Sequence, residues 1–117
     1  DQMGVVHNSN YLVWFEMGRT EYARHFGLPY SKIEEEGFFF VVAESHVKYK
    51  KPAFYADELI VRTWCTDLKP VTFKFNYEIT RKGTGEVVAE GYTRHVNVSK
   101  ETRRPVRMPA HIMDVMK

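Results

Sequence analysis

The first residues of the sequence combine side chains that could do chemistry at the start of a helix. Asp1 supplies a carboxylate, Gly4 lets the backbone approach a ligand closely, and Asn8 and Ser9 can each cap a helix. An exposed acid beside the positive end of a helix is a setting for general-base or nucleophilic chemistry. This stretch therefore indicates a catalytic loop followed by a helix, although an Asp ahead of a helix is, taken alone, more often a turn residue.

The element that must position this loop is a long helix, predicted from about Ser9 to Gly27. Its first two turns are apolar on nearly every side, which is typical of a buried helix. Gly18, in the middle of this helix, indicates close approach of a strand or of a partner's backbone. Charged residues three positions apart predict a solvated face on the same helix: Glu16 with Arg19, and Glu21 with Arg24.

A second, short helix and then four strands are predicted to follow. Ser31 and Glu34 have the spacing of a capping box, and Gly37 ends the short helix. The strands are expected over residues 38–51, with a bulge near Glu44, and over 59–65, 71–80 and 86–98, before a short helix after Pro109.

The pattern within the strands predicts which faces are buried. Apolar residues alternate with polar ones over 71–80, so one face of this strand should pack on the helix. In the last strand, Val88, Tyr92 and Val96 are expected to share a face. The order of elements predicts an α+β fold in which one antiparallel sheet wraps around a helix, and the open edges of such a sheet favour a dimer.

Composition limits the possible functions. A chain of 117 residues with 44% hydrophobic content fits a single domain over 1–117, and a net charge of +2 is too small to indicate a nucleic-acid partner. No apolar run is long enough to span a membrane. Cys65 is the only cysteine, which predicts no disulfide and a cytoplasmic location, and the histidines lack the paired spacing of metal ligands.

Three segments together resemble one enzyme family. The block from Asp1 to Val6, followed by Tyr11, Trp14–Glu16 and Arg19, resembles the D-x-x-G-[IV]-V…Y…E…R block of 4-hydroxybenzoyl-CoA thioesterase-like, hotdog-fold acyl-CoA thioesterases. The segments VKYKKPAFYADELIV and TGEVVAEGYTRHVNVS are similar to two later segments of that family. The similarity extends from Asp1 to about Pro109. It implies a hotdog fold, a sheet wrapped around a central helix, and a homodimer or a tetramer of dimers.

The resemblance implies that the chain hydrolyses an acyl- or aroyl-CoA thioester. Asp1 would attack the thioester or act as general base for water, and the amides from Val6 to Asn8 would polarise the thioester carbonyl. His7 could orient the acid, line the cleft, or be merely hydrogen-bonded. No metal or cofactor is expected, because coenzyme A is part of the substrate. Gly4 and Tyr11 would border the substrate, although Tyr11 can also be read as a core residue.

Basic residues are expected to contact the phosphates of coenzyme A. The first candidates are Lys69, Arg103 and Arg104, and weaker ones are Lys48, Lys50 and Lys51. Two other functions stay open at this point, an acyl-ACP thioesterase and a non-catalytic acyl-CoA-binding protein. Family members usually carry a further strand before the acid, so the resemblance also predicts a strand that this sequence lacks, and they often have His or Phe where this sequence has Asn8.

Overall fold

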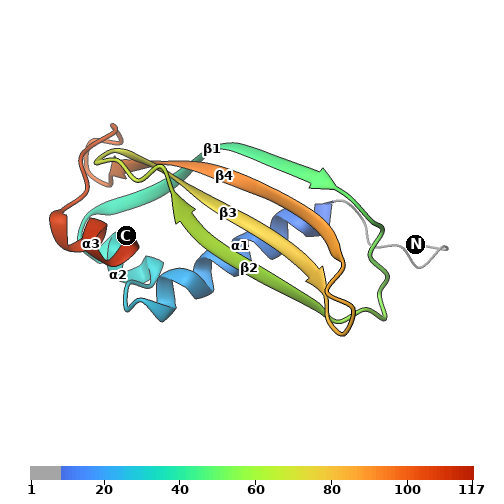
Figure 1. Cartoon of the computed structure of the whole chain (residues 1–117). Coiled ribbons are helices and arrows are strands. Elements are labelled where there is room, and N and C mark those ends of the chain that lie inside the picture. Colours follow the sequence, from blue (N-terminus) through green and yellow to red (C-terminus); the bar gives the residue numbers. More distant parts are fainter. Residues whose placement is uncertain (1–8) are drawn as a thin grey trace.

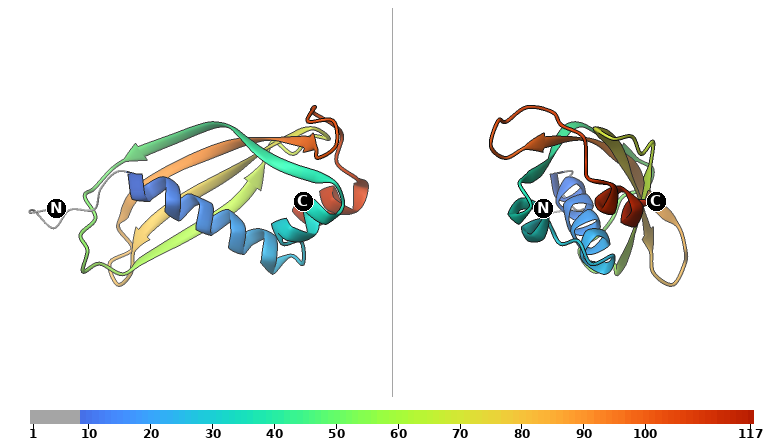
Figure 2. Two further views of the ribbon diagram at one scale, coloured as in Figure 1. Left: turned by 180° about the vertical axis from the view of Figure 1, so that it is seen from behind. Right: turned by 90° about the vertical axis from the view of Figure 1, so that its left-hand side faces the viewer.

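A long helix, α1 (Ser9–His25), lies along the inner face of a four-stranded antiparallel sheet (Figure 1). The computed structural model describes residues 9–117. The strands are β1 (Phe38–Tyr49), β2 (Leu59–Thr66), β3 (Thr72–Arg81) and β4 (Val87–Ser99), in the spatial order β1-β4-β3-β2. Two short helices, α2 (Tyr30–Glu35) and α3 (Ala110–Met116), close the end of the sheet opposite the start of α1 (Figure 2). The predicted α+β fold is confirmed.

The core lies between α1 and the two central strands. Phe15 of α1 is fully buried, and its ring stacks on Tyr77 of β3 with centroids 4.2 Å apart and an angle of 6° between the rings. The predicted alternation in β3 is confirmed. Its inward-facing residues are all buried: Phe73, Phe75, Tyr77 and Ile79. The other face of β3 is directed away from the helix.

Gly18 marks a close approach of α1 to a strand of the sheet, as predicted. A Cβ at Gly18 would lie 2.5 Å from Thr63 Oγ1 and 3.0 Å from Val61 Cγ1, both on β2. Gly27, just beyond α1, has a φ of 78°, a value at which glycine is favoured because it has no Cβ. The predicted stop of this helix is therefore confirmed.

The predicted face of β4 is wrong, because the strand contains an irregularity at its start. The register between β3 and β4 shifts between Ile79 and Thr80, so both Val88 and Ala89 are buried. Beyond this point the alternation is inverted. Thr93, His95 and Asn97 face the core, whereas Tyr92 and Val96 are only partly buried and lie on the opposite face from them.

These inward-facing polar residues form part of a buried polar cluster. The Tyr77 hydroxyl lies 2.6 Å from Thr93 Oγ1, which lies 2.7 Å from His95 Nε2. Arg19 of α1 is half-buried, and its charge acts on Tyr77 and His95. The prediction that Arg19 lies on a solvated face is therefore wrong, whereas the exposed Arg24–Glu21 pair forms as expected at 2.8 Å.

Two further details concern the ends of elements. The predicted cap of α2 is wrong: Pro29 precedes the helix, no side chain caps it, and the Pro29 carbonyl accepts from the N–H groups of Lys32 and Ile33. The bulge in β1 is confirmed between Val42 and Glu44.

Within the described part of the chain, none of the helices has the length and apolar character needed to cross a membrane.

Candidate active site

The sequence predicts the catalytic residues at the start of α1. Asp1, Gly4, Val6, His7 and Asn8 lie outside the described residues, so their arrangement is not part of the structure. The structure does describe the surroundings of the first turn of α1. They consist of Tyr49 at the end of β1, the loop over 50–58, and Arg81 at the end of β3.

Tyr11 fixes the first turn of α1 to these surroundings. Its side chain is only 2% exposed, and its ring makes edge contacts with Trp14 and Tyr49 at centroid distances of 5.0 and 4.9 Å. Burial raises the pKa of the Tyr11 hydroxyl, and a backbone hydrogen bond with Ala53 acts in the opposite direction. Tyr11 is therefore a core residue whose hydroxyl reaches the 50–58 loop, while Tyr49 is 46% exposed beside it.

An ion pair holds the 50–58 loop in place. The Asp57 carboxylate accepts from the Phe54 amide at 2.8 Å and from Arg81 in a short ion pair. Arg81 also donates to the Pro52 carbonyl at 3.1 Å and to Glu86 at 3.0 Å. The hydrogen bond from Phe54 and the Arg81 guanidinium lower the pKa of Asp57. No role was predicted for this pair from the sequence, although Asp57 is the D of the family-like segment P-A-x-x-x-D.

Lys69 and Arg103 lie at the opposite end of the sheet from Tyr11. Phe38 pairs with Ser99 at one end of β1, and Tyr49 pairs with Ala89 at the other, so the two ends are about 36 Å apart at roughly 3.3 Å per residue. Lys69 is exposed in the β2–β3 turn, and Arg103 lies over the Phe39 ring at 5.2 Å. Within one chain, neither side chain can reach the start of α1.

The basic residues ranked lower from the sequence lie at the end where α1 begins. The amides of Lys50 and Lys51 both donate to the Val88 carbonyl, at 2.9 and 3.1 Å. Lys50 pairs with Glu90 at 3.3 Å, while Lys51 is exposed and forms no ion pair within the described range. Lys51 is thus an available cation near the start of α1.

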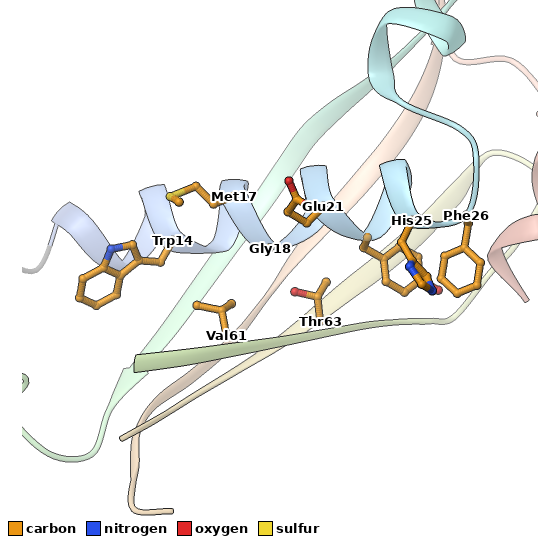
Figure 3. A pocket seen from close by; sticks show the side chains of 9 residues that line it. Trp14, Met17, Gly18, Glu21, His25, Phe26, Val61 and Thr63 are labelled. Atoms are coloured by element: carbon orange, nitrogen blue, oxygen red, sulfur yellow. The ribbon is translucent and has the colours of Figure 1, made fainter. Parts of the chain in front are cut away.

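A separate groove runs between α1 and β2. It encloses about 500 Å³, and Figure 3 shows Trp14, Met17 and Glu21 of α1 on one side of it and Val61 and Thr63 of β2 on the other. Its lining is mainly apolar, and Thr63 Oγ1 is buried without a hydrogen-bond partner in the described chain. The groove follows the edge of β2 that no described strand pairs with.

Comparison with known proteins identifies the family. The family model described as the thioesterase-like superfamily matches residues 1–116. The chain belongs to this superfamily. A Bacillus subtilis protein named as a candidate acyl-CoA thioesterase, YneP, is 36% identical over 107 residues, covering 92% of this chain and 77% of the relative.

Solved structures of similar proteins agree with the fold. A hypothetical protein from Aquifex aeolicus superposes with a TM-score of 0.91 at 35% identity, covering 100% of this chain and 90% of the other. A DHNA-CoA thioesterase from Staphylococcus aureus gives a TM-score of 0.87 at 32% identity, covering 97% and 76%. The predictions of a hotdog fold and of a thioester hydrolase of this superfamily are confirmed.

Proposed function

We propose that this thioesterase-like chain hydrolyses an acyl- or aroyl-CoA thioester to a free carboxylic acid and coenzyme A. Water supplies the hydroxyl of the acid, the C–S bond breaks, and the thiolate leaving group takes up a proton. Asp1 provides the carboxylate, either as nucleophile or as general base for the water. The match to the superfamily over residues 1–116 is the observation that carries this proposal.

The start of α1 supplies the electrostatic part of the mechanism. The first N–H groups of a helix have no partner within it, and its dipole places positive charge at this end. Amides from Val6 to Asn8 would donate to the carbonyl oxygen as negative charge develops there, which commonly contributes a few kcal/mol to lowering a barrier. Gly4 and His7 would line this loop, and Tyr11 and Tyr49 would form the wall beside it.

Each site needs residues from two copies of the chain. Among the strands that the structure describes, β1 pairs only with β4, and its residues 41–46 are exposed, including Val41 at 45% and Val42 at 41%. We expect two β1 edges to pair in antiparallel fashion. This pairing reverses the partner's strand, so Arg103 of the partner subunit would lie at the end where α1 begins and could contact the phosphates of coenzyme A, as could Lys69 of the partner subunit.

The groove between α1 and β2 has a different proposed occupant. The family resemblance predicts a further strand, and the open edge of β2 offers unpaired backbone groups beside an apolar groove. An added strand would cover Trp14, Met17 and Val61 and would bring a partner within reach of Thr63 Oγ1. We therefore propose that the added strand fills this groove and that the thioester binds at the start of α1.

Release of free thiol tests the proposed reaction. The panel runs from acetyl- to palmitoyl-CoA with benzoyl- and 4-hydroxybenzoyl-CoA, and a disulfide dye reports coenzyme A. We expect turnover on one acyl class and its loss in Asp1→Asn, with an unchanged melting temperature. Undiminished turnover in Asp1→Asn would remove Asp1 from the mechanism.

Two further substrates separate the alternatives. Faster cleavage of a carrier-protein thioester than of the CoA form would identify an acyl-ACP thioesterase. Saturable binding of CoA thioesters without thiol release would instead identify a non-catalytic binding protein.

A further inference from the structure

The loop between β1 and β2 crosses one end of the sheet and carries exposed aromatic side chains. Strands β1 and β2 are the two outer strands of the described sheet, so residues 50–58 pass the ends of β4 and β3 on the way (Figure 1). Tyr55 is 60% exposed and Phe54 is 41% exposed, and Tyr49 at the end of β1 is 46% exposed. Large aromatic side chains that are exposed together indicate a surface that another molecule covers.

The same loop is held firmly against the sheet. The Arg81 side chain, at the end of β3, donates to the Pro52 carbonyl at 3.1 Å and pairs with Asp57. The Asp57 carboxylate also accepts from the Phe54 amide at 2.8 Å. Ala53, next to Phe54, is fully buried. The aromatic side chains of the loop are therefore presented to solvent on a fixed support.

The charge that remains unpaired beside these aromatic residues is positive. Lys48, Lys50 and Lys51 are all exposed. Lys50 pairs with Glu90 at 3.3 Å, whereas Lys48 and Lys51 have no ion pair among the residues that the structure describes. The acids of the loop and of the β3–β4 hairpin each have a cation already: Asp57, Glu58 and Glu86. A partner of this surface should therefore be negatively charged as well as partly apolar.

The shape of this end of the molecule favours a bilayer surface as that partner. The loop and the β3–β4 hairpin lie together at one narrow end of the sheet (Figures 1 and 2). A stable protein partner usually covers about 800 Å² on each side, which a narrow end offers poorly. Aromatic rings at a projecting end can instead enter the headgroup region of a bilayer, and lysine side chains beside them reach the anionic lipid phosphates.

We propose that this narrow end docks on a bilayer surface that contains anionic phospholipids. The rings of Phe54 and Tyr55 enter the headgroup region, and the ammonium groups of Lys48 and Lys51 pair with lipid phosphates. The docking surface lies across the end of the sheet, so pairing along the β1 edge leaves it open. The contact does not depend on the proposed hydrolysis.

Co-sedimentation with vesicles tests the docking surface. The vesicles contain equal parts of phosphatidylglycerol and phosphatidylcholine, and vesicles of pure phosphatidylcholine are measured beside them. We expect the wild type to bind the anionic vesicles, and to bind them less at about 1 M than at about 0.1 M salt, because the Debye length falls from about 10 Å to about 3 Å. Phe54→Ser/Tyr55→Ser should weaken binding roughly tenfold or more, and Lys51→Gln roughly fivefold.

Matched controls come from the opposite end of the molecule. Phe26, just after α1, is 43% exposed, and Lys32 is exposed on α2. Phe26→Ser and Lys32→Gln remove the same kinds of side chain and should keep wild-type binding. Melting temperatures show that each variant is folded.

The proposal is overturned if the wild type does not bind the anionic vesicles or binds phosphatidylcholine vesicles equally well. Unchanged binding in Phe54→Ser/Tyr55→Ser, or an equal loss in Phe26→Ser, would also overturn it. Light scattering without vesicles tests the other occupant. A mass that falls in Phe54→Ser/Tyr55→Ser would show that a second copy of the chain covers the loop, against the proposal.

Discussion

Gly91 of β4 lies directly against the ring of Phe15 on α1. A Cβ at Gly91 would be 2.8 Å from Phe15 Cε2 and would collide with the carbonyl oxygen of His46 on β1. The absence of a side chain at Gly91 is what lets Phe15 lie flat on Tyr77. This contact sets the depth at which α1 lies in the sheet, and with it the position of the first turn of the helix.

Gly91→Ala should therefore be strongly destabilising. Backbone on one side and a buried ring on the other leave no room, and overpacking of a core typically costs about 1–3 kcal/mol or more. The melting temperature should fall by roughly 4–8 °C for each kcal/mol. Glu90→Ala, at the preceding residue of the strand but on the outer face, is the control and should change the unfolding free energy by less than about 0.5 kcal/mol. Equal stability of Gly91→Ala and wild type would show that α1 can shift.

Gly18→Ala should also destabilise the protein, but through a contact that can be removed. Alanine favours a helix over glycine by up to about 1 kcal/mol, yet its Cβ would lie 2.5 Å from Thr63 Oγ1. In a Thr63→Ala background the clash is absent, so Gly18→Ala should become neutral or stabilising. Urea unfolding of the four proteins gives the coupling energy between the two positions, expected at about 1–3 kcal/mol. Equal effects in both backgrounds would contradict the close packing.

The sequence predicted the elements well where local signals are strong. The apolar start of α1, the alternation of β3 and the glycines that end α1 and α2 each predict structure through short-range sterics and burial. The close approach at Gly18 was also predictable, because glycine is unfavourable within a helix unless a neighbouring element leaves no room for a side chain. The failures have a common physical cause: they depend on what lies opposite a residue in space.

The irregularity at Val88 is one such case. Both Val88 and its neighbour Ala89 are apolar, so the sequence contains no signal that both are buried, and the face predicted for Tyr92 and Val96 is therefore the opposite of the one they occupy. Arg19 is a second such case. A charged residue on a helix is normally expected to be exposed, but Arg19 lies opposite the buried polar cluster that contains Tyr77 and His95. In the candidate site, the pairing of the strands places Lys69 and Arg103 at the far end of the sheet from Tyr11. This separation cannot be predicted from the positions of basic residues in the sequence alone.

His95 should make stability depend on pH. Burial, with a smaller effect from Arg19, lowers the pKa of His95 to about 3 from 6.5. Between these values the unfolded chain binds a proton that the folded chain does not, so the free energy of unfolding falls as pH decreases from 6.5 towards 3. The loss from this residue is at most about 1.4 kcal/mol per pH unit. We expect unfolding of His95→Gln to show a shallower pH dependence in this window, and parallel curves would refute the assignment.

Asp57 should control the order of the loop beside Tyr11. Asp57→Asn keeps an oxygen that can accept from the Phe54 amide but loses the charge that pairs with Arg81, whereas Asp57→Ala loses both. Amide hydrogen exchange over 50–58 should rise in the order wild type, Asn, Ala. Turnover should fall in the same order if the loop supports the site. Glu21→Gln, which removes an exposed charge from a similar pair, should leave exchange in the loop unchanged.

The shared site can be tested by mixing two inactive variants. Asp1→Asn removes the proposed carboxylate, and Arg103→Ser removes a cation that lies at the opposite end of the sheet from Tyr11 in its own chain. In the proposed dimer this cation lies near the partner's Tyr11. In a mixed dimer both changes fall in one site and leave the other site intact. About half of the dimers in an equal mixture refolded together are mixed, so the mixture should recover about a quarter of wild-type turnover at low substrate concentration. If both residues served the same chain's site, every site would stay defective and no recovery would occur. Arg104→Ser in place of Arg103→Ser shows whether recovery depends on this particular arginine.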